Sequence, residues 1–175
     1  MKAEKRDIIT IIMIALTTLV AIGFFMGNLK EKKTIIQTDL FNLVAPSPHA
    51  ILTINQPKAF ANYMLSLPEE YALFASSIPT IYLDILQNHP TLTSAQLSFH
   101  PDGIIFYAQA DEKQVTQITK ETLEKKFHAF APETLTNDGQ TYTFYPATEN
   151  RFFGCSHSHG IWIASYSKKL LEVVT

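Results

Sequence analysis

The only cysteine of the chain lies next to two histidines at alternate positions, in the segment GCSHSHG at residues 154–160. In an extended strand, side chains alternate between the two faces, so Cys155, His157 and His159 would share one face. A thiolate and imidazoles are ligands that zinc binds at roughly 2.0–2.3 Å. These three residues are therefore the candidates for a metal site, although no further ligand lies nearby in the sequence.

The alternative interpretation of this segment is the rim of a β-hairpin. Gly160 favours a turn, and a turn at residues 157–160 would end the alternation on which a shared metal depends. An earlier segment, HPDG at 100–103, has the same layout: a histidine, two residues, Gly-Ile, a strand, a capping residue and a helix. That copy has neither a cysteine nor a second histidine, so the comparison favours the hairpin. It also suggests two hairpin-plus-helix units on a shared sheet.

No other catalytic pattern emerges from the sequence. The remaining histidines occur singly, and Glu69 and Glu70 are adjacent, so on a helix they would diverge by about 100°. There is no Gly-x-Ser-x-Gly nucleophile motif, and residues 34–175 hold only four glycines, too few for a phosphate-binding loop. The sequence predicts no catalytic residue and no cofactor, and it favours a non-enzymatic role. The isolated histidines are His49, His89, His100 and His128.

Residues 8–29 are the most informative stretch of the chain, because these 22 residues contain no charge. As a helix they would be about 33 Å long, enough to cross a hydrocarbon layer of roughly 30 Å. No small-x-small cleavage site follows, so we expect an uncleaved signal anchor, with a cleaved signal peptide as the alternative. The lipid bilayer is then the first partner of the chain.

The orientation of this anchor follows from the charges that flank it. Three basic residues precede it and three follow it, and the α-amino group tips the balance towards a cytoplasmic N-terminus. The sequence thus predicts a cytoplasmic segment at 1–7, an anchor at 8–29, a tether at 30–48 and a domain at 49–175 that faces the periplasm or cell exterior. Residues 34–175 carry eight basic and 13 acidic residues, a net charge of −5, which argues against a nucleic-acid partner.

Turn residues and hydrophobic periodicity divide the domain into alternating strands and helices. A strand from Ala50 should lead through Pro57 into two or three short helices up to about residue 88. A hairpin turning at 101–103 should lead to a helix at 111–127 that is capped by Asp111. A turn at 137–139 should precede strands at 141–147, 151–156 and 161–166 and a final helix after Ser167. The expected fold is α+β: an antiparallel β-sheet with helices packed on one face.

A single cysteine permits no internal disulfide, so the stability of the domain must come from packing. Ten Phe, seven Tyr and one Trp lie beyond the anchor, and their positions on predicted strands favour a core over a sugar- or peptide-binding surface. An exposed edge of the sheet would also be able to accept a strand from a protein or peptide partner.

The segments SPHAILTINQP (47–57) and HGIWIASYSKKLLEVV (159–174) resemble a loosely defined group of uncharacterised bacterial cell-envelope proteins. The resemblance covers most of residues 46–175 and implies one membrane anchor and an extracytoplasmic domain of unknown function. Members of that group tend to be longer, and this chain stops within an apolar helix, so we expect a truncated copy. The hypothesis is a single-pass binding or scaffolding module of the bacterial envelope. The alternative is a membrane-tethered metal-dependent hydrolase that uses Cys155, His157 and His159.

Overall fold

The computed structural model describes residues 40–137, 139–147 and 151–174, although the side chains of residues 72 and 74 are not among those described. The predicted cytoplasmic segment, the anchor at 8–29 and the first part of the tether lie outside these ranges. Within them, no helix has the length and apolar character needed to cross a membrane.

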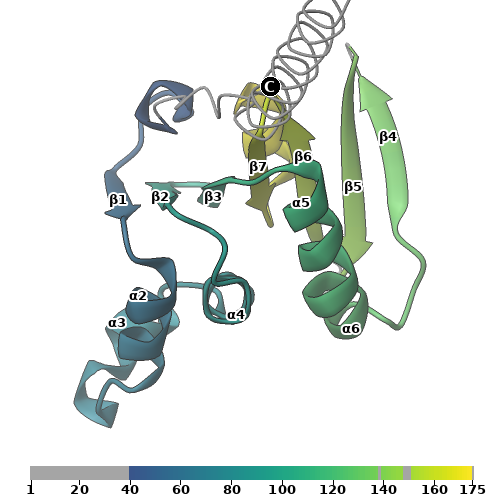
Figure 1. The fold of residues 1–175 in the computed structure, drawn as a ribbon. Helices are drawn as coiled ribbons and strands as arrows, with labels where there is room; N and C mark the ends of the chain where they lie inside the picture. Colours follow the sequence, from purple (N-terminus) through teal and green to yellow (C-terminus); the bar gives the residue numbers. More distant parts are fainter. Residues whose placement is uncertain (1–39, 138, 148–150, 175) are drawn as a thin grey trace, which may run out of the picture. The chain divides into compact units, whose positions relative to one another are not determined.

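A single antiparallel sheet of seven strands organises the described residues, in the order β1-β2-β3-β7-β6-β5-β4 (Figure 1). The hairpins β2–β3 and β6–β7 meet at the centre, where β3 pairs with β7. The α+β class and the antiparallel sheet are thereby confirmed. The strands are β1 (Ala50–Ile54), β2 (Ala95–His100), β3 (Gly103–Gln109), β4 (Glu133–Asn137), β5 (Gln140–Pro146), β6 (Phe152–Ser158) and β7 (Ile161–Ser165).

Short helices connect these strands, largely where the sequence predicts them. Asp111 forms the expected capping box: it accepts a hydrogen bond from the Gln114 backbone N–H at 2.7 Å, and its own N–H donates to Gln114 Oε1 at 2.8 Å. The helical elements are η1 (Leu40–Leu43), α2 (Pro57–Leu65), η2 (Glu69–Tyr71), α3 (Ala72–Ser76), α4 (Thr80–Asn88), α5 (Glu112–Ile118), η3 (Thr119–Leu123), α6 (Glu124–Lys126) and α7 (Lys168–Val174).

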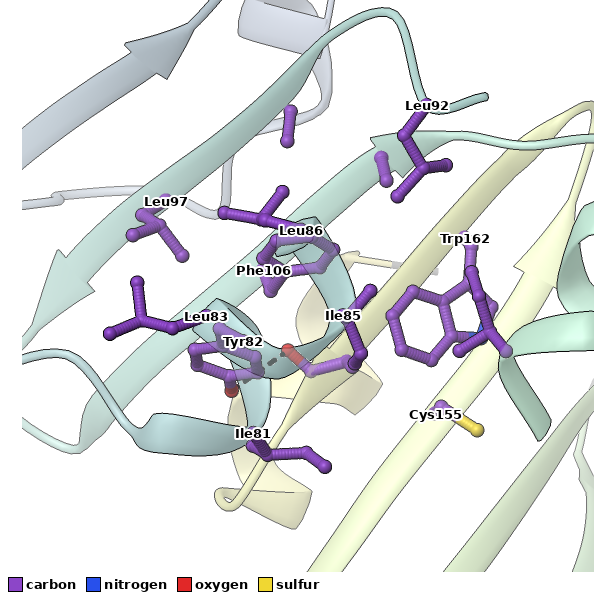
Figure 2. Close-up of a cluster of buried hydrophobic side chains, with 14 of the residues drawn as sticks. Ile81, Tyr82, Leu83, Ile85, Leu86, Leu92, Leu97, Phe106, Cys155 and Trp162 are labelled. Atoms are coloured by element: carbon purple, nitrogen blue, oxygen red, sulfur yellow. Dashed lines mark hydrogen bonds between the residues drawn. The ribbon is translucent and has the colours of Figure 1, made fainter. Parts of the chain in front are cut away.

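The larger core lies between one face of the sheet and the helices α2, α4 and α5–α6 (Figure 2). Its centre is aromatic: the Tyr82 ring stacks on Phe106 at a centroid distance of 5.2 Å, and Trp162 meets Phe106 edge-on at 5.7 Å. The Tyr82 hydroxyl donates towards the carbonyl oxygens of Ile104 and Ala164, each 3.3 Å away. Backbone carbonyl groups of the sheet thus supply the hydrogen-bond acceptors that the buried hydroxyl of Tyr82 needs.

A second core covers the opposite face, which corrects the expectation that all helices pack on one face. Leu170 and Leu171 of α7 cluster there with the inward residues of β3 and β7, and Leu40 and Ala45 join them. The reason is that the central strands, GIIFYAQ and IWIAS, are apolar on both faces, so each face needs a covering layer. Residues 40–45, at the end of the predicted tether, therefore pack on the domain.

Gly154 allows α7 to lie close to the sheet. A Cβ atom at this position would stand 2.5 Å from Leu171 Cδ1 and 2.7 Å from Phe144 Cε1, well inside van der Waals contact. The glycine that opens the GCSHSHG segment is therefore explained by packing.

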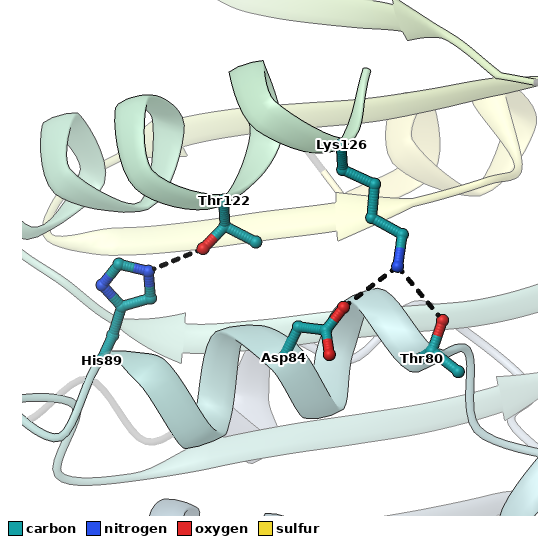
Figure 3. Close-up of polar contacts among 5 residues, drawn as sticks. All are labelled: Thr80, Asp84, His89, Thr122 and Lys126. Atoms are coloured by element: carbon teal, nitrogen blue, oxygen red, sulfur yellow. Dashed lines mark hydrogen bonds and ion pairs between the residues drawn. The ribbon is translucent and has the colours of Figure 1, made fainter. Parts of the chain in front are cut away.

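Polar side chains join α4 and its C-cap residue His89 to the helical segment η3–α6 (Figure 3). His89 Nε2 lies 2.9 Å from Thr122 Oγ1, and Lys126 Nζ lies 3.0 Å from Asp84 Oδ2 and 3.3 Å from Thr80 Oγ1. Burial lowers the pKa of His89, which favours the neutral ring, while Glu121 opposes this shift. His89, one of the histidines that occur singly in the sequence, is thus a buried structural residue.

Candidate functional site

The β6–β7 hairpin determines where the cysteine and histidines lie. His159 and Gly160 both have positive φ, at 51° and 77°, the backbone of a tight two-residue hairpin turn. Strand β6 ends at Ser158, so Cys155 and His157 share a face of the sheet whereas His159 belongs to the turn. The predicted hairpin rim is present.

Each of the three candidate ligands has another contact. His157 Nε2 lies 2.9 Å from the carbonyl oxygen of Ala110, and His159 Nδ1 lies 2.7 Å from Ser158 Oγ. Burial raises the pKa of the Cys155 thiol to about 12, and a hydrogen bond with Trp162 offsets this only in part. Among residues 40–137, 139–147 and 151–174, no group of three or more His, Cys, Asp or Glu side chains is placed to hold a metal ion.

Cys155 is expected to resist thiol reagents in the folded protein. With a pKa of about 12, only about one thiol in 10⁴ is ionised at pH 8, and the thiolate is the reactive form. We expect an aromatic disulfide reagent to label Cys155 only after denaturation in guanidinium chloride, as measured by absorbance. A Thr136→Cys variant, with its exposed thiol, is the control and should add one rapidly reacting group. Rapid labelling of the unaltered protein would contradict the burial of Cys155.

A serine–histidine pair that sequence reasoning missed lies on β2, on the face covered by α7 and η1. Ser98 Oγ is 2.9 Å from His100 Nε2 and donates to the Tyr107 hydroxyl at 3.5 Å, which also accepts the Ala45 backbone N–H at 3.2 Å. Burial lowers the pKa of His100 and His49 lowers it further, whereas Asp102 opposes both. Because the Ser98 side chain is fully buried, this chain of hydrogen bonds fastens residue 45 to the sheet rather than presenting a nucleophile.

The sheet has two edge strands, β1 and β4, and the more exposed of them is β4, which the sequence interpretation also missed. All five of its residues are exposed, and within the described ranges it pairs only with β5 (Figure 1). Asn137 and Gln140 are partners with two residues between them, so they form the hydrogen-bonded pair that closes a hairpin. By alternation, the backbone N–H and C=O groups of Thr134 and Thr136 then point away from β5.

The two faces of β4 carry different side chains: Glu133, Leu135 and Asn137 lie on one face and two threonines on the other. Leu135 pairs with Tyr142 on the face of the second core, where the Leu135 side chain is 47% exposed. On the other face Thr134 and Thr136 pair with Thr143 and Thr141, and the Oγ1 atoms of Thr136 and Thr141 lie 3.5 Å apart. The signal for this strand was the alternation Thr-Leu-Thr directly before Asn-Asp-Gly.

The exposed strand β4 is therefore the candidate functional site, because its outward backbone groups have no partner strand within the described residues. No protein family, no curated protein and no solved structure matches this chain.

Proposed function

We propose that the chain is a membrane-anchored, extracytoplasmic scaffolding module that binds a protein partner by accepting a strand at β4. The observation that carries this proposal is the exposure of the whole of β4. The uncharged stretch at 8–29 supports the anchor, and the net charge of −5 over residues 34–175 supports a protein partner over a nucleic acid.

Strand β4 lacks most of the features by which proteins usually protect a sheet edge, and its only charged residue is Glu133 at one end. Natural edges carry lysines, prolines or bulges that prevent another strand from pairing. The sequence of β4, ETLTN, has no lysine or proline, and its pairing with β5 runs without a bulge. Two threonines would each contribute an N–H and a C=O to an added strand, and each hydrogen bond contributes a net stabilisation of about 0.5–1.5 kcal/mol.

A metal-dependent hydrolase at Cys155, His157 and His159 receives no support from the geometry. The thiol is buried and protonated, and both imidazoles have contacts with other groups. We therefore retain the binding module alone.

The proposed function is tested by removing one outward N–H while leaving the ladder to β5 intact. Thr136→Pro does this, because proline is tolerated at an edge position whose N–H faces solvent. Thr136→Ala is the matched control, since it also removes the threonine side chain but keeps the N–H. The intact chain is co-expressed with a differently tagged second copy, crosslinked in cells, extracted with detergent and purified through one tag, and its partners, the second copy included, are identified by mass spectrometry.

We expect the same identified partner with the unaltered chain and with Thr136→Ala, and at least a tenfold lower recovery with Thr136→Pro. Undiminished recovery with Thr136→Pro would exclude β4 as the binding strand. In the same cells, the chain should stay in the membrane pellet at alkaline pH and be released by detergent. Its release without detergent would contradict the anchor.

A further inference from the structure

We infer that the strand added at β4 is β4 of a second copy of this chain, paired antiparallel about a two-fold axis at Leu135. This inference rests on the proposed function, because it uses the same open edge and names the occupant.

The positions of the outward groups select this register. Antiparallel pairing about Leu135 places Thr134 of one copy opposite Thr136 of the other, so that both outward-facing residues on each chain hydrogen-bond. One alternative register places Thr134 opposite Thr134 of the second copy. It sets Thr136 opposite Pro132 of that copy, which has no N–H to donate. The opposite shift places Thr136 opposite Thr136 of the second copy. Thr134 then faces a position beyond Asn137, where β4 ends, and has no strand partner. The central register alone pairs both threonines within the strand.

The side chains are compatible with this register on both faces. Leu135 of each copy would meet its equivalent beside Tyr142, joining two half-exposed apolar side chains. On the opposite face, Thr134 and Thr136 would extend the threonine pairs that each already forms with β5. The charge of Glu133 would face Asn137 of the second copy, so no like charges oppose each other.

Anchoring in a membrane would allow two copies to pair through a short interface. A contact of one five-residue strand is much smaller than the interfaces of stable soluble dimers, which bury about 1,200–2,000 Å². Two anchored copies are confined to one surface, which raises their effective concentration and converts a weak contact into a populated one. Pairing is therefore expected in membranes, where the test is made.

The register is tested by disulfide crosslinking of the full chain in native membranes. Leu135 would face its equivalent as a non-hydrogen-bonded pair with a Cα–Cα distance of about 4.5 Å, within the range of about 4.4–6.8 Å that a disulfide spans. After mild oxidation, we expect the Leu135→Cys variant to run largely as a dimer, because this register places the two thiols within the range of a disulfide. The unaltered chain, whose only cysteine is the buried Cys155, is the first control and should remain monomeric.

A pair of single variants provides the matched control for register. Glu133→Cys alone should not crosslink, because its equivalent in the second copy lies at the other end of the strand. A mixture of differently tagged Glu133→Cys and Asn137→Cys chains should form the mixed dimer. Adding Thr136→Pro to Leu135→Cys should remove the dimer, whereas Thr136→Ala should leave it.

The possible outcomes separate this inference from the proposed function. The inference is overturned if Leu135→Cys stays monomeric or if Glu133→Cys alone crosslinks equally well. If it fails while Thr136→Pro still loses a different identified protein, the strand comes from that protein and the binding function stands. If Thr136→Pro changes neither the crosslink nor partner recovery, both proposals fail.

Discussion

Replacing Phe106 with alanine is expected to lower the free energy of unfolding by about 3–5 kcal/mol. Phe106 is fully buried on β3, where it stacks on Tyr82 and meets the edge of Trp162. Its removal leaves a cavity between rings that belong to a helix and a neighbouring strand, so the surroundings cannot collapse without shifting both. Urea unfolding of the full chain in mild detergent, followed by circular dichroism, measures the change.

Phe130→Ala is the matched control for this prediction. Phe130 loses the same atoms on truncation, but its side chain is 68% exposed. Its replacement should change the free energy of unfolding by no more than about 0.5 kcal/mol. Equal losses for the two variants would mean that the aromatic cluster of Tyr82, Phe106 and Trp162 is not the centre of the core.

Replacing Gly154 with alanine is expected to destabilise the domain by about 1–3 kcal/mol through overpacking. The new Cβ would meet Leu171 Cδ1 at 2.5 Å and the Phe144 ring at 2.7 Å, and both neighbours are buried between α7 and the sheet. Alanine adds a single methyl group, so any large effect must come from this close approach. The same urea titration measures it.

A double-mutant cycle separates overpacking from other effects of alanine at residue 154. Leu171→Ala alone should cost about 2–5 kcal/mol, because it leaves a cavity under α7. In the double variant the added methyl group occupies part of that cavity, so the combined loss should fall short of the sum by more than about 0.5 kcal/mol. Strict additivity would show that Gly154 does not contact Leu171 in solution.

Much of the fold followed from local signals in the sequence. Asp111 and Gln114 have the spacing of a capping box, and Pro101-Asp102-Gly103 stands between two β-rich runs, so both features could be predicted from neighbouring residues alone. A hairpin turn at 157–160 was predicted for the same reason, from a glycine and its resemblance to the earlier hairpin, but the turn is confined to His159–Gly160 because β6 continues to Ser158.

The features that were missed depend on contacts between distant residues. The close packing of α7 on the sheet depends on Gly154, a glycine that the sequence had linked only to the hairpin segment it opens. The hydrogen bonds that link Ala45 to Tyr107 and Ser98 join segments far apart in the chain. Strand β4 was missed because all its residues are exposed and no buried face marks it.

The candidate site was accordingly less predictable than the fold. The residue types at 155–159 suggested metal chemistry, but the backbone at His159 turns away from the strand and the thiol of Cys155 is buried. The general idea of an open sheet edge came from the sequence. Its place at β4 required the order of the strands, which leaves β1 and β4 at the two edges, and the exposure of every residue of β4.

The position of β7 also has a consequence for the order of folding. Strands β1 to β3 can pair with one another, and so can β4 to β6, but β7 alone connects these two sets. Because β7 follows the other six described strands in the chain, the two halves can join only after β7 has been synthesised. Contacts between distant parts of a chain also form slowly, so docking of β7 is expected to be the late step that completes the sheet.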